Sequence, residues 1–243
     1  MKYLKEYKLF ESVNKQEIHD TCKKYGIENY TINTNGSIDV NDDVNLYNKG
    51  LTKLPVNFRS VSGSFYCFNN NLTNLEGAPS SVDGGFFCYN NKLTSLLGAP
   101  SSVSGDFYCH GNKLTSLEGA PSSVSGDFYC YNNKLTSLEG APSSVSGDFF
   151  CRDNQLTNLG GLEWKSFRTI SLRNNPVHLI VKDWINKEDR IDLIEYFIDM
   201  NVIQDGDDKP KLILPRLEAF YEEINLKMDI NFEEVKKYYE IIE

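Results

Sequence analysis

The residues best suited to chemistry are cysteines, and five of the six recur every 21 residues, at Cys67, Cys88, Cys109, Cys130 and Cys151. Thiols in register could bind a metal or form disulfides. Zinc sites use pairs of Cys or His at short spacing, and the chain has no C-x-x-C motif. Parallel neighbours seldom give the torsion that a disulfide needs, and five thiols leave one over. We therefore expect reduced thiols that act as small core residues, which favours an intracellular compartment.

The other candidates for catalysis or metal binding are weaker. His19, His110 and His178 lie in three separate regions, and we find no Ser/His/Asp set or phosphate-binding glycine loop. The acidic run that begins at Asp205 resembles the start of a calcium loop. Such a loop needs a Glu at its twelfth position, where this chain has Arg216. The sequence thus predicts no catalytic residue, no metal site and no cofactor, so that the protein is not an enzyme.

The 21-residue period extends beyond cysteine and predicts a stacked repeat architecture. One copy, 114–134, reads LTSLEGAPSSVSGDFYCYNNK. In the copy before it, the strand-like alternation places Phe107 and Cys109 on the same side of the chain. The Gly-Ala-Pro segment suits an extended return. Each unit is then a strand, a turn and a return, and stacked units form a parallel sheet with strands about 4.8 Å apart. The Asn that follows each strand, such as Asn112, is expected to satisfy backbone groups in the turn.

Side chains on the opposite side of these strands form three columns. We call the first aromatic column the set Tyr66, Phe87, Tyr108, Tyr129 and Phe150. The second aromatic column is Phe68, Tyr89, His110, Tyr131 and Arg152. The acidic margin is Ser64, Gly85, Asp106, Asp127 and Asp148. Together they predict a candidate binding surface, because solenoids bind through extended faces and soluble proteins rarely leave large aromatic patches unused. Packing of aromatic neighbours within the sheet is the alternative.

The repeat resembles the leucine-rich-repeat core L-x-x-L-x-L-x-x-N-x-L, with Phe at the second Leu of the strand and Cys at the third. Its length and Pro return resemble the short bacterial class. The LTSLEGAPSSVSGDFYCYNN wording resembles leucine-rich-repeat proteins of tailed bacteriophages and large DNA viruses. The resemblance covers about 44–177 and implies an α/β solenoid whose parallel sheet forms a concave binding face. Some bacterial proteins with similar repeats carry a ubiquitin-ligase domain with a catalytic Cys, but no Cys follows Cys151 here.

The flanks are predicted to cap this solenoid. Residues 1–43 should form a helix from Asn14 to Tyr25 and a hairpin at Asn35-Gly36. Residues 44–177 form the solenoid, with an imperfect first repeat in which Lys49 takes the ladder position of Asn. Trp164 and Phe167 are expected to cover the last repeat. Residues 178–243 should be an acidic helical region with helices over 183–186 and 187–200, one beginning near Pro215, and one after Asn231 that extends through Ile242.

Charge and hydropathy limit the partners. The net charge is −9, and residues 177–243 contribute −8 through 9 basic and 17 acidic groups. No basic surface is expected to follow a phosphate backbone, which argues against nucleic acid. No apolar run is long enough for a membrane span, and the first residues lack the core of a secretion signal. We expect a cytoplasmic protein, in the host cell cytoplasm if it is viral.

These observations favour a non-catalytic protein–protein interaction module that binds a host or viral protein through its aromatic face. Such a viral protein could act against a host defence. The alternative is recognition of a glycan or small ligand by the same face, because aromatic rings beside polar groups suit sugars. The sequence specifies neither the partner nor the oligomeric state.

Overall fold

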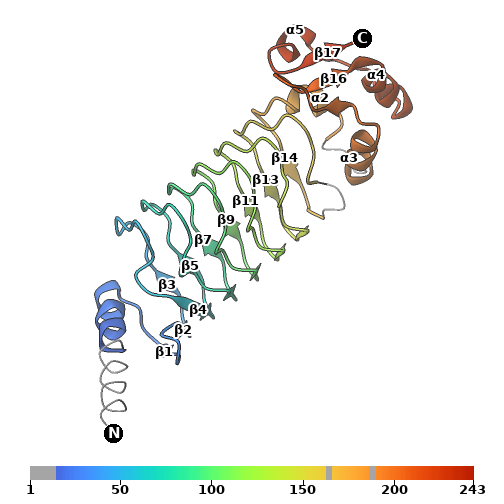
Figure 1. Cartoon of the computed structure of the whole chain (residues 1–243). Helices are drawn as coiled ribbons and strands as arrows, with labels where there is room; N and C mark the ends of the chain where they lie inside the picture. The colour runs from blue at the N-terminus through green and yellow to red at the C-terminus, as the bar shows by residue number, and fades with distance from the viewer. Residues whose placement is uncertain (1–14, 163–165, 186–189) are drawn as a thin grey trace.

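The chain folds into an elongated β-solenoid whose turns follow the 21-residue period (Figure 1). The computed structural model describes residues 15–162, 166–185 and 190–243. Strands of successive turns pair in parallel and in register, as Phe107 and Tyr108 do with Phe128 and Tyr129. The predicted solenoid of parallel strands is therefore confirmed, whereas membership of the leucine-rich-repeat class stays a prediction.

The solenoid contains two sheets, which we call sheet A and sheet B. Sheet B holds the strands predicted from the Phe-x-Cys pattern, in the order β14-β13-β11-β9-β7-β5-β3. These strands are β3 (Val44–Asn45), β5 (Phe65–Tyr66), β7 (Phe86–Phe87), β9 (Phe107–Tyr108), β11 (Phe128–Tyr129), β13 (Phe149–Phe150) and β14 (Ile170–Ser171). The imperfect first repeat and the degenerate last one both join the sheet, since β3 pairs with β5 and β13 with β14.

Sheet A corrects the expectation of a single sheet, because part of each return segment is also a strand. Its order is β1-β2-β4-β6-β8-β10-β12. The strands are β1 (Tyr30–Ile32), β2 (Ile38–Val40), β4 (Phe58–Val61), β6 (Ser81–Val82), β8 (Ser102–Val103), β10 (Ser123–Val124) and β12 (Ser144–Val145). In Ser123-Val124-Ser125 the valine is buried and both serines are exposed, which is the alternation of a strand.

In the five turns from β4 and β5 to β12 and β13, a three-residue corner with a glycine at its centre joins sheet A to sheet B, and close stacking requires that glycine. A Cβ on Gly126 would lie 2.9 Å from the backbone of Gly105 and Asp106 in the turn before. Only a residue without a side chain lets the corners pack at the spacing that the two sheets impose.

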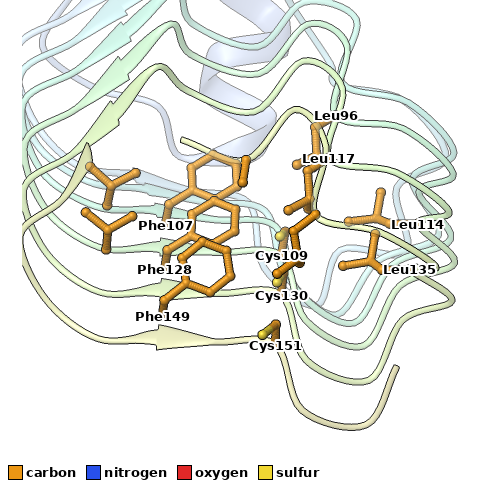
Figure 2. Packing of buried hydrophobic residues seen from close by; sticks show 14 of the residues in the cluster. Leu96, Phe107, Cys109, Leu114, Leu117, Phe128, Cys130, Leu135, Phe149 and Cys151 are labelled. Atoms are coloured by element: carbon orange, nitrogen blue, oxygen red, sulfur yellow. The ribbon is translucent and has the colours of Figure 1, made fainter. Parts of the chain in front are cut away.

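The core fills the space inside the turns with identical side chains stacked in columns (Figure 2). The Phe107 ring lies 5.4 Å from both Phe86 and Phe128, centroid to centroid. The five repeated cysteines are fully buried free thiols, and burial raises the pKa of each, as at Cys109. Among the described residues no group of three or more His, Cys, Asp or Glu side chains is arranged to hold a metal ion.

The asparagine ladder joins each turn to the one before it, and its predicted structural role is confirmed. The Asn91 side chain is 8% exposed. Its Oδ1 accepts from the Leu72 N–H at 3.0 Å, and its Nδ2 donates to Cys67 O and Cys88 O, each at 3.0 Å. The same bonds recur at the other ladder positions, Asn70, Asn112, Asn133, Asn154 and Asn175. Lys49 is tolerated at the first position because no earlier turn needs bridging there.

The N-terminal cap follows the prediction in its described part. A helix covers 15–25, and Gly26 ends it with φ +69°. Its Ile18 and Cys22 side chains are buried in the common core. β1 and β2 form the expected antiparallel hairpin, and β2 then pairs with β4, so the hairpin caps sheet A. The proposed helix cap at Asn14 lies outside the described residues.

The prediction that residues 178–243 are helical is partly wrong. The first helix is α2 (His178–Val181), and residues 182–185 form turns rather than a helix. α3 (Arg190–Asp199) and α4 (Leu214–Glu223) confirm two predicted helices, with Pro215 in the first turn of α4. The predicted ends at residues 186 and 187 lie outside the described residues, as does Trp164. Phe167 is buried and its ring lies 6.1 Å from Phe149, so it covers the last repeat as expected.

The last predicted helix is also too long. α5 (Phe232–Val235) stops after one turn, and Asn231 makes no side-chain cap bond. β17 (Glu240–Ile242) instead pairs with β16 (Lys211–Ile213), which pairs with β15 (Ile203–Gln204) in a small third sheet. A buried tyrosine joins this region to the solenoid, because Tyr239 Oη donates to Thr157 O at 2.6 Å. It sits at the end of the solenoid opposite the N-terminal helix (Figure 1).

Candidate interaction surface

The second aromatic column is a continuous stack of nearly parallel rings. Tyr89 lies 4.4 Å from Phe68 and 4.5 Å from His110, with interplanar angles of 7° and 9°. His110 lies 4.2 Å from Tyr131, and the Arg152 guanidinium closes the stack 4.4 Å from the Tyr131 centroid. Both faces of each interior ring are therefore covered, and only ring edges and polar tips meet solvent.

The stack also contains a residue that sequence reasoning missed. Tyr47 lies 5.0 Å from Phe68 at an angle of 3°, and its side chain is 44% exposed. It occupies the second-column position one period before Phe68. The signal was present in the 21-residue spacing but was hidden by the imperfect first repeat.

The first aromatic column is built from stacked pairs rather than from one stack. Tyr66 stacks on Phe87 at 4.9 Å, and Tyr108 stacks on Tyr129 at 4.3 Å. Phe87 and Tyr108 meet edge to face at 86°. Gly85 leaves room for the Phe87 ring, because a Cβ at that position would lie 2.5 Å from it. A side chain at position 85 would therefore force the Phe87 ring to move.

A groove of about 450 Å³ runs between the two columns. It is lined by Tyr66, Phe68, Phe87, Tyr89, Tyr108, His110, Tyr129 and Tyr131. The structure therefore brings together eight of the ten predicted residues of the two columns. The other two continue the columns beyond the groove: Phe150 packs edge to face on Tyr129, and Arg152 pairs with Asp153 at 2.5 Å.

The acidic margin has a structural role that sequence reasoning did not foresee. Asp106 Oδ1 accepts the Asp127 N–H at 2.9 Å, and Asp127 Oδ1 accepts the Asp148 N–H at 2.8 Å. The second oxygens face the groove, because Tyr108 Oη donates to Asp106 Oδ2 at 3.2 Å and Tyr129 Oη to Asp127 Oδ2 at 3.3 Å. Asp148 instead binds Arg168 through both carboxylate oxygens. One oxygen of the Asp106 and Asp127 carboxylates thus bonds to the backbone of the next turn, and the negative charge lies beside the first aromatic column.

His110 is held neutral within the second column. Burial between two tyrosines, together with the positive charge of Arg152, lowers the pKa of His110 to about 4. Its Nδ1 is buried and has no hydrogen-bond partner among the described residues. At neutral pH it behaves as a flat, uncharged ring that continues the stack. Burial and the charge of Asp106 raise the pKa of Tyr108, so its hydroxyl stays protonated.

A second cavity lies at the junction between the solenoid and the C-terminal region. It has a volume of about 740 Å³ and is lined by residues that include Thr136, Gln155, His178, Glu234 and Tyr238. Its walls combine hydroxyl, amide and carboxylate groups with few aromatic rings. His178, one of the weaker candidates named from the sequence, lines it, but no member of the aromatic columns or of the acidic margin does.

Comparison with protein-family models, with curated proteins and with solved structures gives no match for this chain. Within the described ranges, no helix is long and apolar enough to cross a membrane.

Proposed function

We propose that this protein is a non-catalytic interaction module that binds another protein through the groove between its two aromatic columns. The observation that supports this most is the groove itself, a hollow lined by eight aromatic side chains on one face of a rigid sheet. Tyrosine offers a large contact area at low entropic cost and is common at the centres of protein interfaces.

Ring orientation favours a protein over a glycan. A sugar stacks its C–H groups on the negative face of an aromatic ring, whereas the faces of Tyr89, His110 and Tyr131 are covered by their neighbours. The groove instead presents positive ring edges and tyrosine hydroxyls, which suit backbone carbonyls and aliphatic side chains. The leucine-rich-repeat kinship, a viral origin, a cytoplasmic location and action against a host defence remain part of this proposal and rest on the repeat wording alone.

The test is affinity capture with chemical cross-linking, followed by binding assays with each purified candidate. Three baits are compared: the unchanged protein, a Tyr108→Ala, Tyr129→Ala double variant, and Leu97→Ser as a control. Leu97 is 58% exposed and lies on the solenoid away from the groove. We expect a partner that binds the unchanged protein and the control but not the double variant. Equal binding of one partner to all three folded baits would overturn the proposal, and binding of a polysaccharide alone would favour the glycan alternative.

A further inference from the structure

The dimensions of the groove restrict the shape of the partner segment. Ring centroids of the two columns lie 6.4 Å apart at Tyr66 and Phe68 and 6.0 Å apart at Tyr108 and His110. These are contact distances for aromatic rings, so the groove is a shallow channel over touching side chains, and a bound segment lies along it rather than between the columns. A single extended chain can follow such a shallow channel along the direction in which the turns stack.

The backbone of the solenoid excludes the usual way of binding an extended chain. A bound β-strand needs a free sheet edge, but the strands beneath the groove already bond to both neighbours. Cys88 N–H donates to Tyr108 O at 2.9 Å, and Cys109 N–H donates to Tyr129 O at 2.8 Å. The groove therefore offers only side chains. A polyproline II helix suits this surface, because it has no internal hydrogen bonds and its carbonyls can accept bonds from side-chain donors.

The length and period of the groove also match a polyproline II segment. Three turn-to-turn intervals of about 4.8 Å separate Tyr66 from Tyr129, which gives roughly 14 Å. A polyproline II chain rises about 3.1 Å per residue, so four or five residues fill that length. Its three-residue turn of about 9.3 Å is close to two solenoid intervals, roughly 9.6 Å, and the first column has the same two-turn period. That period is visible in the stacked pairs Tyr66–Phe87 and Tyr108–Tyr129.

The charge beside the groove indicates what flanks the segment. Asp106 and Asp127 border the first column, each with one oxygen directed at a tyrosine of the groove. The corresponding positions in the two preceding turns are Ser64 and Gly85, which carry no charge. A basic side chain on the partner would therefore be favoured at one end only, beside Asp106 and Asp127.

We propose that the groove binds a proline-rich polyproline II segment flanked by Lys or Arg, with the basic residue beside Asp106 and Asp127. This inference rests on the proposed function and adds the chemistry of the partner. The apolar prolines pack against the rings of the two columns, and the hydroxyls of Tyr66, Tyr89 and Tyr131 donate to the peptide carbonyls, because those of Tyr108 and Tyr129 already donate to Asp106 and Asp127. The segment is already extended in solution, so it loses little conformational entropy on binding.

The test uses fluorescence anisotropy with four labelled synthetic peptides of equal length. The first alternates proline and leucine and ends in two arginines. In the second, glutamates replace the arginines; in the third, glycine and serine replace the prolines; the fourth is an alanine-rich helical peptide with two arginines. We expect the first to bind about tenfold or more tightly than each of the others, and added salt to weaken its binding.

Matched protein variants separate the two parts of the recognition. Asp106→Asn, Asp127→Asn keeps the oxygens that accept the Asp127 and Asp148 N–H groups and removes the charge. It should weaken the arginine peptide about three- to tenfold and reduce its preference over the glutamate peptide. Tyr89→Phe, Tyr131→Phe keeps the ring stack, removes two hydroxyl donors and should weaken all proline peptides. Circular dichroism melting confirms that each variant is folded.

Equal binding of the helical or glycine–serine peptide would overturn the polyproline assignment, as would binding of none of the four. If no peptide binds while protein capture still depends on Tyr108 and Tyr129, this inference fails and the proposed function stands. If capture is also unaffected by the groove variants, both fail.

Discussion

Replacing one buried ladder asparagine should destabilise the solenoid, because its side chain bonds to backbone groups of two turns. In Asn91→Ala the Leu72 N–H loses its acceptor, and Cys67 O and Cys88 O each lose one of two asparagine donors. A buried N–H without a partner costs about 1–3 kcal/mol, and the lost donations add roughly 1 kcal/mol. We expect the free energy of unfolding to fall by about 2–4 kcal/mol. Guanidinium unfolding followed by circular dichroism measures the change, and hydrogen exchange at Leu72 reports it locally.

Lys49→Ala is the matched control, because Lys49 holds the same repeat position but its side chain bridges no earlier turn. Its effect should stay within about 0.5 kcal/mol. Asn91→Asp tests the direction in which stability changes with pH. The carboxylate keeps the acceptor but faces the carbonyls of Cys67, Cys88 and Tyr89, so its pKa in the fold should rise above the unfolded value. The variant should therefore gain stability as pH falls through that raised pKa and lose it as pH rises. Equal effects of Asn91→Ala and Lys49→Ala would refute the reasoning.

Three further predictions follow from the packing. Gly119→Ala should cost about 1–3 kcal/mol in thermal or chemical unfolding, because φ is +84° there and the new Cβ would lie 2.5 Å from Leu97 N; a neutral result would contradict the close approach. The five core thiols should resist iodoacetamide in the folded protein and react together on unfolding, since burial raises their pKa; mass spectrometry that finds rapid labelling of the native state would disprove this. By NMR the His110 ring should stay neutral from pH 6.5 down to about 4. Because the unfolded chain binds more protons in that window, His110 should reduce stability as pH falls, and His110→Phe should flatten that slope.

Much of the solenoid could be predicted because each turn repeats the same pattern of buried residues and the same turn residue. The alternation around Phe107 and Cys109 fixes which side chains enter the core, and the Asn112 position fixes the turn after the strand. The aromatic columns followed from the same alternation. The second sheet was missed because Ser123-Val124 is too short and too rich in serine to indicate a strand by propensity, and register with neighbouring turns decides it.

The remaining differences come from tertiary contacts that spacing does not encode. Val235, Tyr239 and Ile242 have helical spacing, yet β17 pairs with β16 and ends the helix early. Ring orientation could not be predicted either, since Phe87 lies parallel to Tyr66 but nearly perpendicular to Tyr108 within one repeated column. The acidic margin was interpreted only as surface charge, whereas Asp106 and Asp127 also accept backbone N–H groups.

The asparagine ladder has a consequence for how such a protein can change in size. Every bond it makes runs to its own turn or to the one before, so an inserted 21-residue copy would supply all the partners that its neighbours lose. The ion pairs Asp39–Arg59 and Asp148–Arg168 lie near the two ends, where the copies differ in sequence. Insertion of a central copy would leave both pairs in place. Duplication or loss of one copy would lengthen or shorten the groove by about 4.8 Å without redesign of the fold. Changes in the number of copies can thus alter the length of the binding face in steps of one turn.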